Sequence, residues 1–61
     1  MAIKEIAQKF LVLDKDFTYK DVETIFGNDY TDALIVLDIL IDRGLCETIS
    51  RKDKTSFRIL N

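Results

Sequence analysis

The sequence predicts an α+β domain in which three helices precede a two-stranded β-hairpin. Apolar residues recur at helical spacing in three segments of residues 2–43, and glycines at Gly27 and Gly44 close two of these segments. The rest of the chain carries strand-forming residues on either side of a polar stretch. Because no proline, repeat or low-complexity segment divides the chain, we expect a single domain over residues 1–61.

The first helix is expected from Ala2 to about Leu13. Charged and amide side chains occupy one side of it. The other side is an apolar stripe with the spacing i, i+3, i+4, i+7 that one face of a helix produces. The stripe consists of Ile3, Ile6, Ala7 and Phe10.

The second helix is expected from Tyr19 to Phe26. Thr18 is placed to cap its N-terminus, and Asp21, three residues later, completes a capping box. Gly27 ends the helix, since glycine adopts positive φ at the lowest steric cost. The residues expected to point inward are Val22, Ile25 and Phe26.

The third helix is expected to begin after a cap at Asn28 or Asp29 and to end at Arg43. Gly44 suits the position after the helix in a Schellman motif, in which Leu45 folds back on the last turn. One broad apolar arc should pack against the first two helices. The arc consists of Tyr30, Ala33, Leu34, Leu37, Leu40 and Ile41, with Val36 at its edge.

The hairpin is predicted from strand-forming residues that flank the polar turn 51–55. Phe57 and Ile59 alternate with polar residues, so they share one face of the hairpin. The face that Ile49 joins depends on the strand register, which the sequence leaves open.

Charge is distributed unevenly along the chain, whose net charge is −2. Residues 1–50 contain five Lys or Arg and ten Asp or Glu, whereas residues 51–61 contain four Lys or Arg and one Asp. An acidic body with a basic hairpin differs from a dedicated nucleic-acid binder, in which basic residues usually prevail.

The residue types argue against catalysis and metal binding. The chain has no histidine and a single cysteine, Cys46, so neither a Cys/His zinc site nor an internal disulfide can form. It also lacks a glycine-rich phosphate loop. We therefore expect a protein that is not an enzyme and uses no cofactor, metal or small-molecule substrate. Cys46 is expected to be a small buried apolar residue.

The lone thiol, together with the absence of an export signal, predicts a cytoplasmic protein. No apolar run reaches the roughly 18–20 residues that cross a membrane, so no membrane contact is expected.

The order of these elements resembles the winged helix-turn-helix family. The resemblance rests on residues 17–27 followed by the third helix, and on Leu40-Ile-Asp-Arg-Gly-Leu-Cys-Glu47, which looks like the family's exit from that helix into the hairpin, or wing. It covers nearly the whole chain. In this family the third helix normally enters the major groove of DNA, and the wing normally touches the backbone. The resemblance therefore implies a winged-helix fold and a DNA-binding function.

The outer face of the third helix does not suit DNA. Thr31, Asp38 and Asp42 lie opposite the apolar arc, with Asp32 nearby. A DNA-reading face usually carries Arg, Lys, Asn, Gln or Ser, and carboxylates repel phosphates instead of releasing counterions. This face is thus a solvated surface, a surface that avoids DNA, or the contact site of a basic protein partner.

Ile35 and Ile39 form an i, i+4 pair that lies well off the apolar arc, beside the acids. Exposed isoleucines on one ridge are unusual for a small soluble monomer. The hairpin or the first helix could cover them. Alternatively, they contact a protein together with Val36, either in a homodimer or in an adaptor of a transcription or DNA-handling complex.

Basic side chains on the hairpin provide the second candidate surface. They are Arg51, Lys52, Lys54 and Arg58, which suit phosphate contacts or an ordinary solvated turn. The DNA-binding hypothesis adds residues at the starts of the second and third helices, namely Lys20, Asn28, Tyr30 and Thr31. The favoured interpretation is a protein-interaction module, and the alternative is a small DNA-binding transcriptional regulator.

Overall fold

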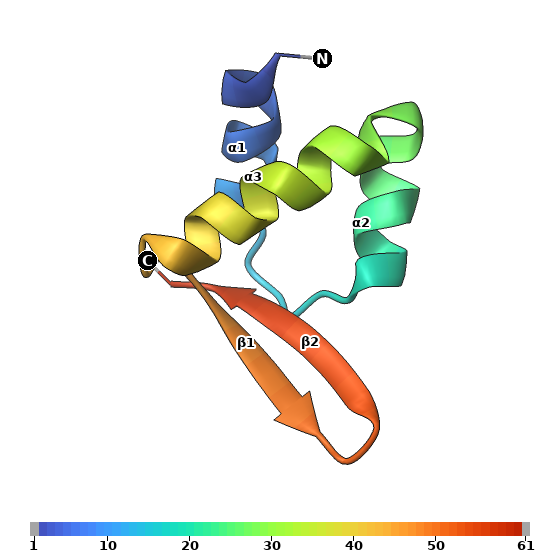
Figure 1. Cartoon of the computed structure of the whole chain (residues 1–61), viewed down its shortest axis with the longest axis vertical. Helices are drawn as coiled ribbons and strands as arrows, with labels where there is room; N and C mark the ends of the chain where they lie inside the picture. Colours follow the sequence, from blue (N-terminus) through green and yellow to red (C-terminus); the bar gives the residue numbers. More distant parts are fainter. Residues whose placement is uncertain (1, 61) are drawn as a thin grey trace.

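The computed structural model describes residues 2–60 and shows a helical body from which a hairpin projects (Figure 1). The elements in chain order are α1 (Ile3–Leu11), α2 (Tyr19–Phe26), the short 3-10 helix η1 (Gly27–Asp29), α3 (Tyr30–Asp42), β1 (Cys46–Arg51) and β2 (Lys54–Ile59). The strands are antiparallel and form a two-stranded sheet. The predicted α+β class is therefore confirmed.

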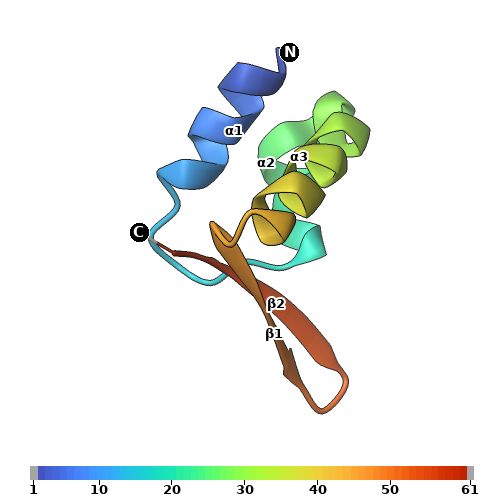
Figure 2. The same cartoon turned by 60° about the vertical axis from the view of Figure 1, so that its left-hand side comes forward.

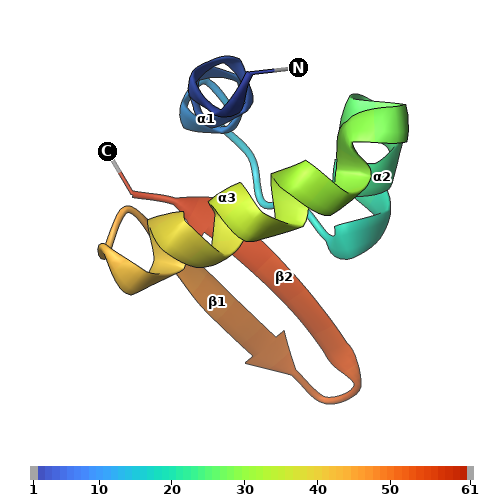
Figure 3. The same cartoon turned by 45° about the horizontal axis from the view of Figure 1, so that its top comes forward.

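Helix α3 is the element that joins the others. It packs against α1, α2 and β1. Figure 1 shows it passing in front of α1 and continuing from the end of α2, and Figures 1 and 3 show its C-terminal end leading into the hairpin. The hairpin turn lies far from the helices, as Figure 2 also shows.

The core lies between the helices and the near half of the hairpin. Phe10 is fully buried at its centre, with its ring centroid 4.8 Å from that of Phe26 and 5.7 Å from that of Phe17. The Phe17 ring lies a further 5.7 Å from Phe57 of β2. This chain of aromatic contacts links α2, α1, the α1–α2 connection and the hairpin. No polar or charged residue of the described chain is buried.

Local sequence signals set the helix ends. The capping box between Thr18 and Asp21 is formed in both directions, as predicted. Gly44 has a φ of 76°, its N–H donates to the Ile41 carbonyl at 3.1 Å, and the Leu45 N–H donates to the Leu40 carbonyl at 2.9 Å. These are the two hydrogen bonds of a Schellman motif, which is thus confirmed.

The hairpin register resolves the position of Ile49. Ile49 pairs with Ser56 and lies on the outer face. Phe57 and Ile59 share the opposite face, as predicted, and both are buried. The turn is shorter than expected, because pairing continues to Arg51 and Lys54. Phe17 and Phe57 also exchange two backbone hydrogen bonds, of 2.9 and 2.7 Å, which attach the α1–α2 connection to β2.

Two expectations for α1 and one for α2 were wrong. Helix α1 ends at Leu11 rather than near Leu13, and Ile3 of its expected stripe is 61% exposed. The core begins deeper, at Ile6, so the first turn of α1 extends beyond it. Ile25 of α2 is 40% exposed, since it borders a surface hollow beside the α1–α2 connection instead of the core.

The buried arc of α3 is rotated from the expected one. Val36 is buried at 2% exposure, whereas three members of the expected arc are only half-buried. These three are Tyr30, Leu34 and Ile41. A helix that is apolar on most sides does not specify which sector will be covered. The packing of α1, α2 and β1 decides it, and together they cover the sector centred on Ala33 and Leu40.

Candidate interaction surfaces

The uncovered side of α3 presents apolar and acidic side chains together. Ile35 is 53% exposed and Ile39 is 42% exposed, so neither the hairpin nor α1 covers them. We call this side the α3 face. It consists of Thr31, Asp32, Ile35, Asp38, Ile39 and Asp42, all of which are exposed. In Figure 1 α3 lies nearest the viewer, and no other element crosses in front of it.

Val36 does not belong to this face. The sequence suggested that it joins Ile35 and Ile39, but its side chain is buried in the core. It lies one residue from Ile35, and a helix turns through about 100° per residue. That rotation places Val36 on the side of α3 that packs against the core. The prediction that Val36 contacts a protein partner was therefore wrong.

Two shallow hollows run along the α3 face. The first is lined by Tyr19 of α2 and by Leu34, Ile35, Leu37, Asp38 and Ile41 of α3. The second follows toward the C-terminal end, lined by Asp38, Ile39, Ile41, Asp42 and Arg43. Asp38 and Ile41 belong to both hollows, so the two adjoin each other along the helix. Sequence reasoning missed the contribution of Tyr19, because it depends on how α2 crosses α3.

The carboxylates of the α3 face have no ion-pair partner within residues 2–60. Asp32, Asp38 and Asp42 form neither an ion pair nor a side-chain hydrogen bond in this part of the chain. The only cation that lines either hollow is Arg43. The face therefore combines net negative charge with exposed isoleucines.

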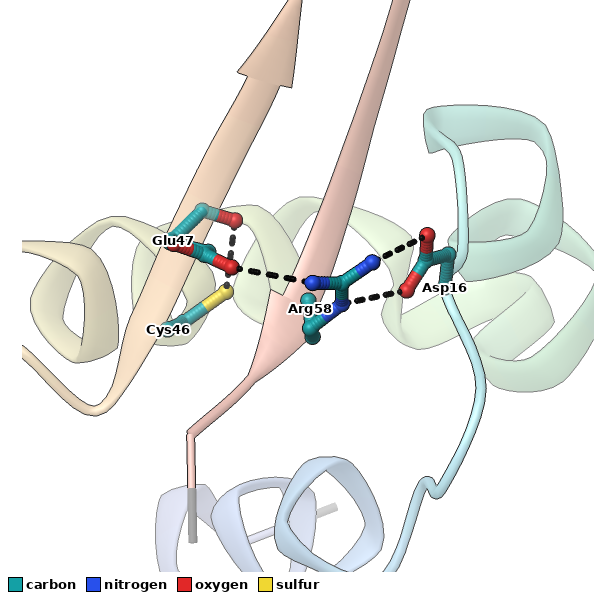
Figure 4. A network of polar contacts seen from close by, with 4 residues as sticks. All are labelled: Asp16, Cys46, Glu47 and Arg58. Carbon is teal, nitrogen blue, oxygen red and sulfur yellow. Dashed lines mark hydrogen bonds and ion pairs between the residues drawn. The ribbon is translucent and has the colours of Figure 1, made fainter.

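On the hairpin, in contrast, a charged side chain is paired with charges of opposite sign, as Figure 4 shows for Arg58. The guanidinium of Arg58 donates to both carboxylate oxygens of Asp16, from Nε at 2.8 Å and from Nη2 at 3.1 Å. It also donates to the Glu47 carboxylate at 3.4 Å. These contacts hold the pKa of Asp16 below its usual value, chiefly through the hydrogen bond from Arg58, and raise the pKa of Arg58.

Arg58 is therefore a poor candidate for a phosphate contact, because two carboxylates already match its charge. We call Asp16, Glu47 and Arg58 the Arg58 clip, which joins the α1–α2 connection to both strands. The Glu47–Arg58 pairing follows from the strand register, and Asp16 approaches from 42 residues away in the sequence. No local signal in the sequence indicated it.

The remaining predicted DNA contacts do not form one surface. Arg51, Lys52 and Lys54 are exposed near the hairpin turn, and within the described residues none of them forms an ion pair. Asn28 and Thr31 are exposed at the junction of α2 and α3, which lies at the opposite end of the molecule in Figure 1.

Two further predicted DNA contacts come from the helices. Lys20 is exposed in the first turn of α2. Tyr30 is half-buried and packs against the core, which leaves less of its side chain for DNA than expected.

Cys46 is buried, as predicted, and its thiol donates a weak hydrogen bond to the Glu47 carbonyl at 3.7 Å. Burial raises the pKa of the thiol, which makes it a poor nucleophile. Across residues 2–60, acidic and cysteine side chains nowhere gather in threes as a metal ion would need. No helix in that range has the length and apolarity to cross a membrane.

Comparison of the chain with protein-family models, with curated proteins and with solved structures found no match.

Proposed function

We propose that this chain is a non-enzymatic binding module with a winged-helix architecture, and that its third helix contacts another protein. One observation carries the proposal: Ile35 and Ile39 are about half exposed on an uncovered helix face. Exposed apolar residues that lie together and are rimmed by polar groups commonly mark interaction sites. The contact would be made by Ile35 and Ile39, without Val36.

The winged-helix part of the proposal is supported by the order of the elements. Helices α1, α2 and α3 precede the hairpin, and α2 and α3 meet at a short junction around Gly27. The hairpin follows directly after the Schellman motif at Gly44. This is the arrangement that the resemblance to winged helix-turn-helix proteins implies.

The charge of α3 supports a protein partner over DNA. In the family, the exposed side of this helix is the side that reads base edges. Here it carries three acids that lack a compensating cation, apart from Arg43 at the end. Bringing them to a phosphate backbone would add repulsion at each contact.

Site-specific photo-crosslinking tests the proposal, with the photoreactive variant expressed in the cells in which the chain naturally occurs. A photoreactive residue replacing Ile39 should give one discrete adduct with a protein, and Ile35→Ser should abolish it. The same photoreactive residue replacing Val12, which is 78% exposed away from α3, is the matched control. Adducts that are absent at Ile39, or equal at both positions, would rule out a specific contact through α3.

A DNA-binding regulator is the second candidate function, and it is favoured by three cations near the hairpin turn that form no ion pair with any residue from 2 to 60. In this case duplex DNA would bind through Arg51, Lys52 and Lys54, with little contribution from α3. Fluorescence anisotropy with mixed duplex DNA at low salt measures this binding. Micromolar affinity that the double variant Arg51→Ala and Lys52→Ala weakens would support this candidate. It would also show that α3 is not the only functional surface.

A further inference from the structure

Three rows of side chains run along the exposed side of α3. Residues spaced i, i+4 and i+7 lie on the same side of a helix, so each such set of residues forms one row. Two of the rows are apolar, one about half exposed and the other half-buried, and the row between them is polar and acidic. In order around the helix, the rows are Ile35 and Ile39, then Thr31, Asp38 and Asp42, then Leu34 and Ile41.

We infer that this face binds a helical segment of another protein, in which a row of Lys or Arg lies between two rows of apolar residues. The inference rests on the proposed function of α3 and specifies its partner. An apolar row on each side of Asp38 and Asp42 would exclude water from the contact. Charge-assisted pairing with a cation is then stronger than it would be on an open surface.

The length of the groove fits a helix. The two hollows together extend from Leu34 to Arg43, which is about 14 Å at 1.5 Å per residue. Two to three turns of a partner helix cover that distance. Helices that lie in apolar grooves anchor themselves by side chains at i, i+3, i+4 and i+7, so a partner helix of this length has room for two or more anchors on each apolar row.

A second copy of the chain fits the face poorly when the same face meets itself. A two-fold symmetric contact places each residue opposite the same surface of the partner copy. The acids Asp38 and Asp42 would then approach their own equivalents. Juxtaposed like charges oppose association, and Arg43 alone cannot compensate for them.

The hairpin of a second copy is also a poor partner. It offers Arg51 and Lys54 on the same face as Ile49, which provides the right charge. However, Ile49 is the one apolar residue of that face among the paired positions, and it is already half-buried. Such a contact would leave Ile35 and Ile39 largely exposed.

Selection from a helical-peptide display library tests the inference. The library is randomised with equal shares of apolar, acidic and basic residues, and it is selected on the purified wild-type chain. Selected peptides should carry Lys or Arg between apolar rows. The double variant Asp38→Asn and Asp42→Asn should weaken their binding roughly tenfold or more, and rising salt should weaken it further. The double variant Ile35→Ser and Ile39→Ser should reduce binding at least as much.

The control is the double variant Val12→Ser and Asp14→Asn, which removes one exposed apolar residue and one exposed acid away from α3. It should leave peptide affinity unchanged. Sedimentation of the unbound chain should give a monomer.

Three outcomes would overturn the inference. Peptides that need the isoleucines but not Asp38 and Asp42 would overturn the basic partner and leave the proposed function intact. A complete lack of isoleucine-dependent peptides would overturn both. A dimer that dissociates in the double isoleucine variant would identify a second copy as the partner.

Discussion

The α3 face and the hairpin are two charged surfaces of this molecule, and they differ in whether their charged side chains are paired within the fold. On the hairpin, Arg58 lies between two carboxylates and fastens the strands to the α1–α2 connection. On the α3 face, Asp38 and Asp42 have no ion-pair partner in the described chain, and isoleucines beside them are exposed. The charge of Arg58 is thus satisfied within the fold, whereas the acids and isoleucines of the α3 face remain available to contact another molecule.

This difference separates structural charges from charges that are available for binding. Net charge by residue range suggested a basic hairpin, but Arg58 is neutralised locally, so within residues 2–60 the hairpin cations without an ion pair all lie at the turn end. The acidic character of α3 is undiminished by such pairing. A contact with another molecule should therefore change the surroundings of α3 more than those of the Arg58 clip.

The largest expected effect is a difference in folding stability between substitutions on the buried and the exposed side of α3. Leu37 is buried at 2% exposure and Ile35 is 53% exposed, although they are two residues apart. Leu37→Ala should lower the free energy of unfolding by about 2–5 kcal/mol, because it removes buried methyl groups and leaves a cavity. Ile35→Ala should change it by no more than about 0.5 kcal/mol. Urea denaturation followed by circular dichroism measures both values.

In a domain of this size the loss at Leu37 is a large share of the total stability. Thermal melting provides a second measurement if Leu37→Ala is already partly unfolded without urea. Similar destabilisation by both variants would mean that Ile35 is covered, and the distinction between the two sides of α3 would fail.

A smaller effect is expected at the junction between α3 and the hairpin. Gly44→Ala should destabilise the fold by roughly 1 kcal/mol, since alanine is strained at a φ of 76°. The cost comes from the backbone alone, because an added Cβ would meet no atom within 4 Å. Chemical denaturation measures the cost. An unchanged midpoint would mean that the turn after α3 relaxes readily.

The two surfaces also predict a specific salt dependence for duplex DNA. If the three free cations of the hairpin contact phosphates, log affinity should fall with log salt at a slope of about −2.7. Arg51→Gln should reduce that slope by about 0.9, whereas Arg58→Gln should leave it unchanged, because Arg58 is already paired. Anisotropy titrations at several salt concentrations provide the slopes. Equal reductions by both variants would show that DNA opens the Arg58 clip.

Features with local causes could be predicted from the sequence. The bounds of α2, its capping box and the Schellman motif at Gly44 that follows α3 all depend on residues within a few positions of each other. The α+β class followed from hydrophobic spacing in the same way. Ile3 and Ile25 were misplaced because their burial depends on where distant elements stop covering a helix.

The candidate site was predictable in part. Ile35 and Ile39 stood out because they are apolar residues that lie off the apolar arc of their own helix, and they are exposed. Val36 was misassigned because most of α3 is apolar, so the sector beneath α1, α2 and β1 could not be located by pattern alone. The Arg58 clip was not predictable, since it needs the strand register and the path of the α1–α2 connection together.

The smallest expected effect concerns the Arg58 clip and acid. The Arg58 hydrogen bond lowers the pKa of Asp16 in the folded state, so the folded chain binds a proton there less readily than the unfolded chain. The clip therefore stabilises the fold at pH values above the ordinary aspartate value of 3.8, and this contribution is lost as the pH falls through the lowered pKa.

Asp16→Asn should accordingly be less stable than the wild type near neutral pH, by a small amount because both partners are exposed. The two stability curves should converge as the pH falls below the ordinary aspartate value of 3.8 and through the lowered pKa of Asp16, where the folded wild type gains its proton. Asp14→Asn removes a nearby exposed acid outside the clip, so its curve should follow the wild type. Denaturation midpoints measured from pH 7 to pH 2 give the curves. A stability difference between Asp16→Asn and the wild type that stays the same at every pH would mean that the Asp16–Arg58 ion pair does not stabilise the fold. The paired charges of the hairpin would then have no structural role to set against the unpaired charges of α3.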